Sequence, residues 1–372
     1  PLAAAYLPHC VPAGRTARVA HNSRPVVMDE GYDDTFAQAP SPAYAAPGLS
    51  PCTIKVIGVG GGGGNTINRM VQEGPGVERS TFLEYVACNT DIQALSASAA
   101  DATIQLGKNQ ARGLGAGGVP AVGRASAIDA AAEIEELVQG VDMIFVTAGM
   151  GGGTGSGAAP VVAELAKQAG CLTVGIVTKP FLFEGRRRMT QALEAIEELQ
   201  QHVDILIVVS NDKLLEIVPE GVPLQEAFSL ADEILRQGIT GISDIVVKPG
   251  LINVDFADVR SVMANAGPAL MGIGRGFGKT RARDAALAAV SSPLLDFPIE
   301  KAKGVVFTIT GTSDMSLQEV NDVATVISSI VSNDANIIFG TSVDESYGDE
   351  IAVTVVATSF EVPDEAPAPP AI

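Results

Sequence analysis

The sequence predicts an α/β fold: a doubly wound parallel sheet, one long connecting helix, and a smaller α+β domain at the carboxyl end. Short apolar strands alternate with helices through the first part of the chain, which is typical of a parallel sheet with helices on both faces. Two glycine-rich segments each follow a strand there, and sheets of this kind bind ligands at the carboxyl ends of their strands. From about Pro223 the alternation gives way to a long helical pattern.

Nine elements alternate in the first part of the chain. The sequence predicts, in order, strand Ile54–Val59, helix Asn65–Gln72, strand Phe82–Cys88, helix Ser126–Val138, strand Met143–Thr147, helix Ser156–Ala169, strand Leu172–Thr178, helix Arg187–Gln201 and strand Asp204–Val209. The strands are short apolar runs, and the helices carry apolar residues at helical spacing, so a sheet with covered faces is expected.

A single long helix, Leu224–Ile245, is predicted next. It carries apolar residues at helical spacing along one side, namely Leu224, Phe228, Ala231, Leu235, Ile239 and Ile242. Its length predicts that it runs along the first domain and reaches a second. The segments that follow predict a mixed or antiparallel sheet with helices; they are Ala269–Gly274, Thr280–Val290, Gly304–Thr310, Leu317–Val331, Asn336–Thr341 and Ile351–Thr358.

These patterns divide the chain into five parts. They are a disordered, transit-like segment 1–50, an α/β domain 51–222, the connecting helix 223–245, an α+β domain 246–360 and a disordered tail 361–372. Residues 1–28 contain Arg15, Arg18 and Arg24 but no acidic residue, a composition that resembles an organelle transit peptide. An ordinary disordered bacterial tail is the alternative interpretation of this segment.

Composition and charge exclude several kinds of partner. The formal net charge of −19 argues against duplex DNA or an anionic lipid surface, because both attract basic surfaces. The absence of Trp and the few aromatic residues argue against a surface that stacks nucleic-acid bases. No apolar run reaches the roughly 18 residues that a membrane span needs. The spacing of the four cysteines and three histidines predicts no protein-held metal site.

The first glycine-rich segment has two interpretations. Gly58, Gly60 and Gly63 satisfy the spacing of the dinucleotide fingerprint after a strand, and Asp91 is a candidate partner for a ribose hydroxyl. This favours an NAD-dependent oxidoreductase, but no constellation of His, Lys or Tyr suited to hydride transfer follows. A Walker loop is excluded, because the segment before Gly278-Lys279-Thr280 has Ile273 where that pattern needs glycine.

The second glycine-rich segment, Gly149–Gly157, is more specific. Its glycines offer backbone N–H groups, and the hydroxyls of Thr154 and Ser156 can donate to phosphate oxygens. A tight turn with glycine for close packing is the alternative, and it would need fewer glycines. Two such segments in one sheet predict a polyphosphate held from two sides.

The segment Gly151-Gly152-Gly153-Thr154-Gly155-Ser156-Gly157 closely resembles the tubulin signature loop, and residues 52–360 resemble the FtsZ family. The resemblance rests on the ordered blocks IKVIGVGGGGGN, GLGAGG, AGMGGGTGSGAAP, TKPF-x-FEG, NDKLL, RQGI-x-GISD and NVDFADVR. It implies a GTPase that binds GTP or GDP with Mg²⁺, and a chain that assembles head to tail.

The resemblance also implies which residues hold the nucleotide. The implied set comprises Gly61, Gly62, Gly63, Gly64 and Asn65 on phosphate, Ala116, Gly117 and Gly118 near the γ-phosphate, Gly152, Gly153, Thr154, Gly155, Ser156 and Gly157 around the α- and β-phosphates, Glu184 and Arg188 at the ribose and nucleoside, and Asn211, Phe228 and Asp232 at the base. A carboxylate at Asp232 suits the N1–H and N2–H donors of guanine. From periodicity alone, Phe228 and Asp232 would be a core aromatic and a surface acid, and Glu184 with Arg188 an i,i+4 ion pair.

The block from Asn253 to Arg260 carries the catalytic residues that the resemblance implies: Asn253, Asp255 and Asp258. If a helix begins near Asp255, both aspartates project from one face and can orient a water molecule or hold a metal ion. The alternative is that Asp255 is only a helix N-cap. In FtsZ-like proteins the equivalent loop meets the nucleotide of the neighbouring subunit.

The implied function is a GTP-hydrolysing polymer that forms a division ring. A filament subunit with little turnover and, more remotely, the NAD-dependent oxidoreductase are the alternatives. GKTRARDAAL and SPLLD are closer to plastid and cyanobacterial members, which with the basic first segment predicts the chloroplast stroma; the bacterial cytoplasm is the alternative. Co-assembly with a second FtsZ type is expected, without nucleic acid or direct membrane insertion. Residues 363–372 show no tail motif that would identify a tether protein.

Overall fold

The computed structural model describes residues 52–72, 83–217, 223–247, 254–295, 299–332 and 334–360. The predicted segments 1–50 and 361–372 lie outside these ranges, as does Asn253. The backbone of Phe228 belongs to a described helix, but its side chain lies outside the description.

Within the described residues, ten strands form one continuous sheet in the order β3-β2-β1-β4-β5-β6-β7-β10-β8-β9. Their bounds are β1 Ile54–Val59, β2 Leu83–Asn89, β3 Ala102–Gln105, β4 Met143–Gly149, β5 Leu172–Lys179, β6 Ile205–Ser210, β7 Gly267–Phe277, β8 Ala302–Gly311, β9 Asn336–Val343 and β10 Glu350–Phe360. Strands β1 to β6 pair in parallel. Strand β7 pairs in parallel with β6 at its beginning and antiparallel with β10 beyond, so it joins both halves of the sheet.

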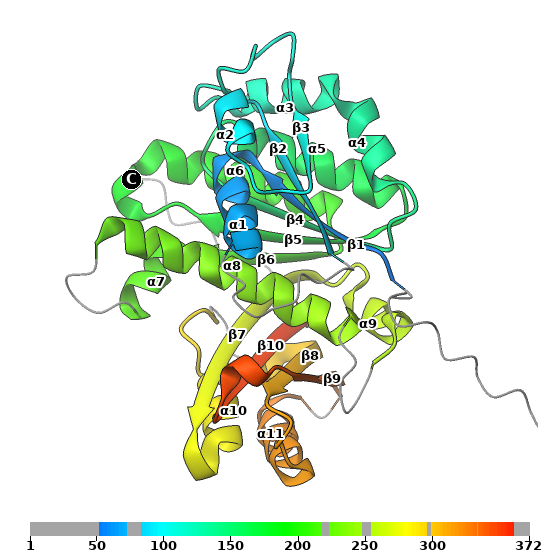
Figure 1. Ribbon diagram of the computed structural model, residues 1–372, viewed down its shortest axis with the longest axis vertical. Coiled ribbons are helices and arrows are strands. Elements are labelled where there is room, and N and C mark those ends of the chain that lie inside the picture. The colour runs from blue at the N-terminus through cyan, green and yellow to red at the C-terminus, as the bar shows by residue number, and fades with distance from the viewer. Residues whose placement is uncertain are drawn as a thin grey trace, which may run out of the picture. The chain divides into compact units, whose positions relative to one another are not determined.

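Helices cover both faces of the parallel half (Figure 1). Their bounds are α1 Gly60–Gln72, α2 Ile92–Ser96, α3 Pro120–Asp129, α4 Ala131–Val138, α5 Thr154–Gln168, α6 Arg186–His202, α7 Asn211–Ile217, α8 Leu224–Val247, α9 Phe256–Met263, α10 Arg281–Val290 and α11 Leu317–Ile330, with short 3₁₀ turns η1 Leu182–Glu184, η2 Gly278–Thr280, η3 Ile299–Lys301 and η4 Glu345–Tyr347. Residues of α3, α4, α5 and α6 share one core with the sheet, and residues of α1, α8 and α9 share another. The predicted doubly wound sheet is therefore confirmed.

Helix α8 supplies the core that the two halves of the sheet have in common. Its buried residues, including Leu235 and Ile239, join one cluster with Phe145 of β4 and with Met271 and Val356 of the second half. Helix α8 can pack closely against β7 because residue 238 is glycine: a Cβ atom there would lie 2.8 Å from the Met271 sulfur. None of the described helices, this one included, is long and apolar enough to cross a bilayer.

The second half of the sheet is mixed, as predicted. Strand β10 runs antiparallel to β7 and β8, whereas β8 and β9 are parallel. Helices α10 and α11 pack on the face away from α8, in a core that includes Ala285, Phe307 and Val323. This confirms the smaller α+β part of the predicted fold.

Several predicted boundaries are wrong. Helix α1 begins at Gly60 rather than Asn65, so the glycine run is helix and not loop. The single helix predicted over Ser126–Val138 is two, because α3 starts at Pro120 and the backbone leaves helical geometry at Ala130 (ψ 10°). Strand β7 extends beyond the predicted Ala269–Gly274 at both ends. Strand β3 and the short helices α2 and α7 were not predicted.

Ion pairs around the buried Arg281 fix the start of α10 against the start of α11. Arg281, whose side chain is 9% exposed, donates from Nε to Glu319 Oε1 at 2.6 Å and from Nη2 to Asp314 Oδ2 at 3.1 Å. Glu319 also completes a capping box with Ser316 at the start of α11. Hydrogen bonds from Arg281 hold the pKa of the Glu319 carboxyl down at about 2.

We predict that Glu319→Gln lowers the melting temperature by several degrees at pH 7. A depressed folded-state pKa stabilises the protein above the unfolded-state pKa and loses that contribution as the pH falls towards the folded value. The difference between wild type and variant should therefore shrink between about pH 4.5 and about pH 2. Thermal melting across this range measures it, with the exposed Glu135→Gln as the control. A difference that stays constant with pH would contradict this assignment.

Candidate functional site

The two glycine-rich segments meet at the carboxyl edge of the parallel strands. A Cβ atom at Gly60 would lie 2.9 Å from the Gly155 nitrogen, and one at Gly62 would lie 3.0 Å from the Gly149 nitrogen. Helices α1 and α5 thus begin side by side, after the neighbouring strands β1 and β4. Their first N–H groups have no partners within the helix and carry partial positive charge. The strand order reverses between β1 and β4, where sheets of this kind bind ligands.

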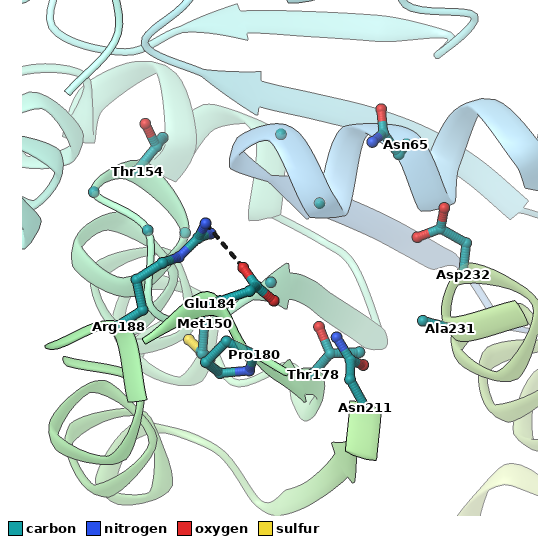
Figure 2. Close-up of a pocket in the computed structure, with 16 residues that line it drawn as sticks. Asn65, Met150, Thr154, Thr178, Pro180, Glu184, Arg188, Asn211, Ala231 and Asp232 are labelled. Atoms are coloured by element: carbon teal, nitrogen blue, oxygen red, sulfur yellow. Dashed lines mark ion pairs between the residues drawn. The ribbon is translucent and has the colours of Figure 1, made fainter. Parts of the chain in front are cut away.

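A cavity of about 340 Å³ opens at this point. Figure 2 shows its walls: Asn65 of α1 and Asp232 of α8 on one side, and Thr154, Glu184 and Arg188 on the other. The full lining is Gly61, Gly62, Asn65, Gly149, Met150, Gly152, Gly153, Thr154, Gly155, Thr178, Pro180, Glu184, Arg188, Asn211, Ala231 and Asp232. Thirteen of these sixteen positions are polar residues or glycines that expose backbone, which suits a charged, polar ligand.

Polar groups are held in place around the cavity. Glu184 Oε2 lies 2.9 Å from Arg188 Nη1, and Glu184 Oε1 accepts the N–H of Phe181 at 2.9 Å. The i,i+4 ion pair is therefore real, and it lies in the cavity wall. Thr66 donates to Asp232 Oδ1 at 3.3 Å, which fixes α1 against α8.

Asn211 provides an independent indication that this cavity is a ligand site. This residue begins α7 after β6, is 6% exposed, and lines the cavity. Its Oδ1 is buried and has no hydrogen-bond partner in the described structure. Buried acceptors are rarely left without a donor. A ligand with N–H or O–H donors at this end of the cavity would satisfy it.

Most of the predicted binding residues line the cavity. Those that do are Gly61, Gly62, Asn65, Gly152, Gly153, Thr154, Gly155, Glu184, Arg188, Asn211 and Asp232. Those outside its lining are Gly63, Gly64, Ala116, Gly117, Gly118, Ser156 and Gly157. The buried Ser156 hydroxyl accepts the N–H of Gly151 at 2.8 Å, which shapes the loop itself.

Close packing explains most glycines of the second segment. Added Cβ atoms would collide with the Arg188 carbonyl at Gly151, with Ala116 and Val119 at Gly153, with Gly149 at Gly155 and with Pro120 at Gly157, whereas Gly152 faces open space. The packing interpretation therefore holds for four of the five glycines between Gly151 and Gly157. The two interpretations agree, because this packing brings the backbone N–H groups of the loop to the cavity.

Loop 107–118 packs directly against the second glycine-rich segment. The Ala116 methyl and the Gly118 nitrogen would lie 2.8 Å and 3.1 Å from a Cβ at Gly153. Gly115, Gly117 and Gly118 all have positive φ, which explains why this loop is built from glycine. The loop thus lies next to the end of the cavity that the second glycine-rich segment forms, without forming part of its wall.

Some lining residues were not predicted. Gly149 ends β4 and Met150 follows it, Thr178 lies near the end of β5 and Pro180 follows that strand, and Ala231 precedes Asp232 on α8. For the first four of these residues, the position at the carboxyl end of a strand is the signal that could have identified them. Asp91, the alternative ribose ligand, instead caps α2 by accepting from the Gln93 N–H.

The two aspartates at α9 lie at the opposite edge of the sheet. Asp255 is the N-cap of α9, with Oδ1 accepting the Asp258 N–H at 2.7 Å, and both residues are exposed. Helix α9 and the turn after it are hydrogen-bonded to the residues that precede two strands. The Arg260 side chain donates to the Gly170 carbonyl before β5, and the Asn265 N–H donates to the Asp204 carboxylate before β6. The N-cap interpretation is therefore confirmed, and Asp255 stays exposed to solvent while it caps the helix.

Strand length separates these aspartates from the cavity. Strand β5 runs from Leu172, at the edge near α9, to the cavity edge at Thr178, and these seven residues span roughly 20 Å. Neither carboxylate can reach the cavity of its own chain. The described residues contain no cluster of three or more His, Cys, Asp or Glu side chains that could hold a metal ion.

Comparison with known proteins identifies the family. Residues 53–219 match the model of the Tubulin/FtsZ family GTPase domain, and residues 267–361 match that of the FtsZ family C-terminal domain. The FtsZ dimer of M. jannaschii is 42% identical, with 86% of this chain and 95% of that chain covered and a TM-score of 0.79. The chain belongs to the Tubulin/FtsZ family.

Two further solved structures are also similar to this chain. A point mutant of M. jannaschii FtsZ is 45% identical over 83% of this chain and 92% of that chain, with a TM-score of 0.79. CetZ2 from Haloferax volcanii, at 22% identity, a TM-score of 0.71 and coverage of 84% and 94%, shares the fold. As a family member the chain is a GTPase that binds GTP and GDP. The cavity suits that ligand, with helix N-termini for phosphates and the Asn211 acceptor for a base.

We predict that Asp232→Asn weakens GDP binding and narrows the preference for guanine over adenine nucleotides. A carboxylate can accept from two guanine donors, and bonds to charged groups contribute about 1.5–3 kcal/mol each. An amide keeps one acceptor and presents its NH₂ group to the other donor. Calorimetry with GDP and ADP measures both effects.

The neighbouring Glu233→Gln is the matched control, since Glu233 pairs with Arg236 and is not among the residues that line the cavity. If the guanine preference of Asp232→Asn equals that of wild type, base recognition belongs to other residues, with Asn211 first among them.

Proposed function

We propose that this GTPase assembles head to tail, and that Asp255 and Asp258 of one subunit complete the hydrolytic site on the nucleotide of the next. One observation carries the proposal: the nucleotide cavity and the two exposed carboxylates lie at opposite edges of the same sheet. A stack of subunits in one orientation brings these edges together. Such a heterologous contact does not close on itself and so builds filaments.

Each edge contributes a different part of the reaction. N–H groups at the starts of α1 and α5 would hold the phosphates, Glu184 the ribose, and Asp232 with Asn211 the guanine. The exposed carboxylates of Asp255 and Asp258 would orient and polarise the attacking water molecule. Asn253, the third predicted catalytic residue, lies outside the described residues. The M. jannaschii FtsZ relative is described as a dimer, and CetZ2 as a GTPγS-bound protofilament, which supports assembly.

Magnesium would be bound mainly through the nucleotide. The donors that the cavity offers near the phosphate end are hydroxyl and amide groups, such as Thr154 and Asn65, and Mg²⁺ commonly keeps several water ligands when it binds phosphates. The ion would neutralise charge on the β- and γ-phosphates.

The cellular role is a further proposal. We propose a division-ring filament of the chloroplast stroma that co-assembles with a second FtsZ type. The acid-free composition of residues 1–28 and the plastid-like blocks GKTRARDAAL and SPLLD support this location. Import of the labelled chain into isolated chloroplasts tests it, and a chain that stays outside would favour the bacterial cytoplasm.

We predict that Asp255→Ser binds GTP like wild type but hydrolyses it roughly 10²–10⁴ times more slowly. Serine is itself a good N-cap, so the variant keeps α9 while removing the carboxylate. Asp322→Ser, an exposed carboxylate on α11, is the control and should keep full turnover.

Mixing identifies the subunit that supplies the carboxylate. Thr154→Arg should block the cavity while leaving Asp255 intact, and turnover should partly return when this variant is mixed with Asp255→Ser. Loss of GTP binding in Asp255→Ser would place this residue in the pocket of its own chain and contradict the proposal.

A further inference from the structure

One buried threonine is bonded to both loops on the phosphate side of the cavity. Thr90 follows β2 and is fully buried. Its Oγ1 lies 2.6 Å from Thr154 Oγ1, in the cavity wall at the start of α5. Its carbonyl accepts the N–H of Gly115 at 3.1 Å, within the loop that stands on Gly153.

The direction of the hydroxyl pair follows from burial. Each threonine hydroxyl has one hydrogen to donate, and either atom of this pair could be the donor. Were Thr154 the donor, the hydrogen of the fully buried Thr90 would need another acceptor, and none is recorded among the described residues. Buried donors are rarely left unsatisfied. The favoured arrangement therefore has Thr90 donating and Thr154 accepting.

This direction has a consequence for the ligand. With its oxygen already accepting from Thr90, Thr154 keeps its own hydrogen free, and Thr154 is one of the residues that line the cavity. A phosphate oxygen is a strong acceptor and bonds to it are charge-assisted. We propose that Thr90 is a positioning residue of the phosphate site, which turns the Thr154 hydroxyl into a donor to the nucleotide.

The hydrogen bond that the Thr90 carbonyl accepts from Gly115 connects the same residue to loop 107–118. The turn after β2 also holds loop 107–118 through the Ile92 N–H, which donates to the Gly113 carbonyl at 3.1 Å. The same turn therefore sets two things: the position of loop 107–118, which the resemblance places near the γ-phosphate, and the direction of the hydrogen bond between the Thr90 and Thr154 hydroxyls. Thr90 itself lies outside the cavity lining, so it acts through Thr154 and not by contact with the nucleotide.

The inference rests on the proposed nucleotide site, and four single substitutions and one double variant test it. Thr90→Val removes the hydroxyl at nearly constant shape, and Thr90→Ser keeps it. Thr147→Val is the matched control, because the Thr147 hydroxyl on neighbouring β4 is equally buried and has no partner in the described structure. Thr154→Val, alone and combined with Thr90→Val, completes a double-mutant cycle.

Calorimetry with GDP on dilute, unassembled protein gives the readout. We expect Thr90→Val to weaken binding about tenfold, and Thr90→Ser and Thr147→Val to bind like wild type. In the Thr154→Val background, Thr90→Val should add no further loss. Melting of the nucleotide-free proteins checks folding, and Thr90→Ala replaces Thr90→Val if the latter does not fold.

Two results would overturn the inference: Thr90→Val binding like wild type, or its loss persisting in full without the Thr154 hydroxyl, which would mark a general structural role. Wild-type protein that binds neither GDP nor GTP would instead refute the proposed function itself.

Discussion

The close contact between the beginnings of α1 and α5 is the constraint on which the site depends. Gly60 and Gly62 approach Gly155 and Gly149 so closely that no side chain fits between them. Without this approach the two helix N-termini would not face one cavity, and neither would offer enough N–H groups for a polyphosphate. The acidic net charge of the chain makes these backbone donors more important, since the cavity lining contains one cationic side chain, Arg188.

Helix α8 carries this arrangement into the rest of the molecule. Its amino-terminal part lines the cavity with Ala231 and Asp232, while Gly238 and Gly241 pack against β7 and β10 of the second half. Helix α9 then lies at the far edge of the sheet, bonded to residues that precede β5 and β6. The cavity and the carboxylates of α9 are thus fixed at opposite edges by the same strands and the same helix.

Much of the fold was predictable because its signals are local. Alternating apolar strands and amphipathic helices predict the doubly wound sheet, and the Asp255 N-cap follows from one acidic residue before a helical pattern. The start of α1 was not predictable, since a run of glycines disfavours helix locally and only packing against β4 and α5 stabilises it. The continuity of the sheet through β7 depends on pairing between segments distant in sequence.

The residues of the site also fall into a group that could be predicted from the sequence and a group that could not. Residues whose chemistry acts on a ligand, such as Glu184 and Asp232, were predicted through their resemblance to a family and lie in the cavity wall. Residues that act on other protein groups were missed or misassigned, because only coordinates reveal their partners. Ser156 shapes its own loop through the Gly151 N–H, and Thr90 carries no motif that separates it from any buried threonine.

The most direct test of the account is GTP turnover per molecule, measured over a wide range of protein concentration. Because the nucleotide cavity and the α9 carboxylates of one chain lie at opposite ends of strand β5, an isolated subunit has an incomplete site. The specific activity should be near zero in dilute protein and rise above a threshold concentration at which filaments form. A specific activity that stays constant through dilution to isolated subunits would contradict the account.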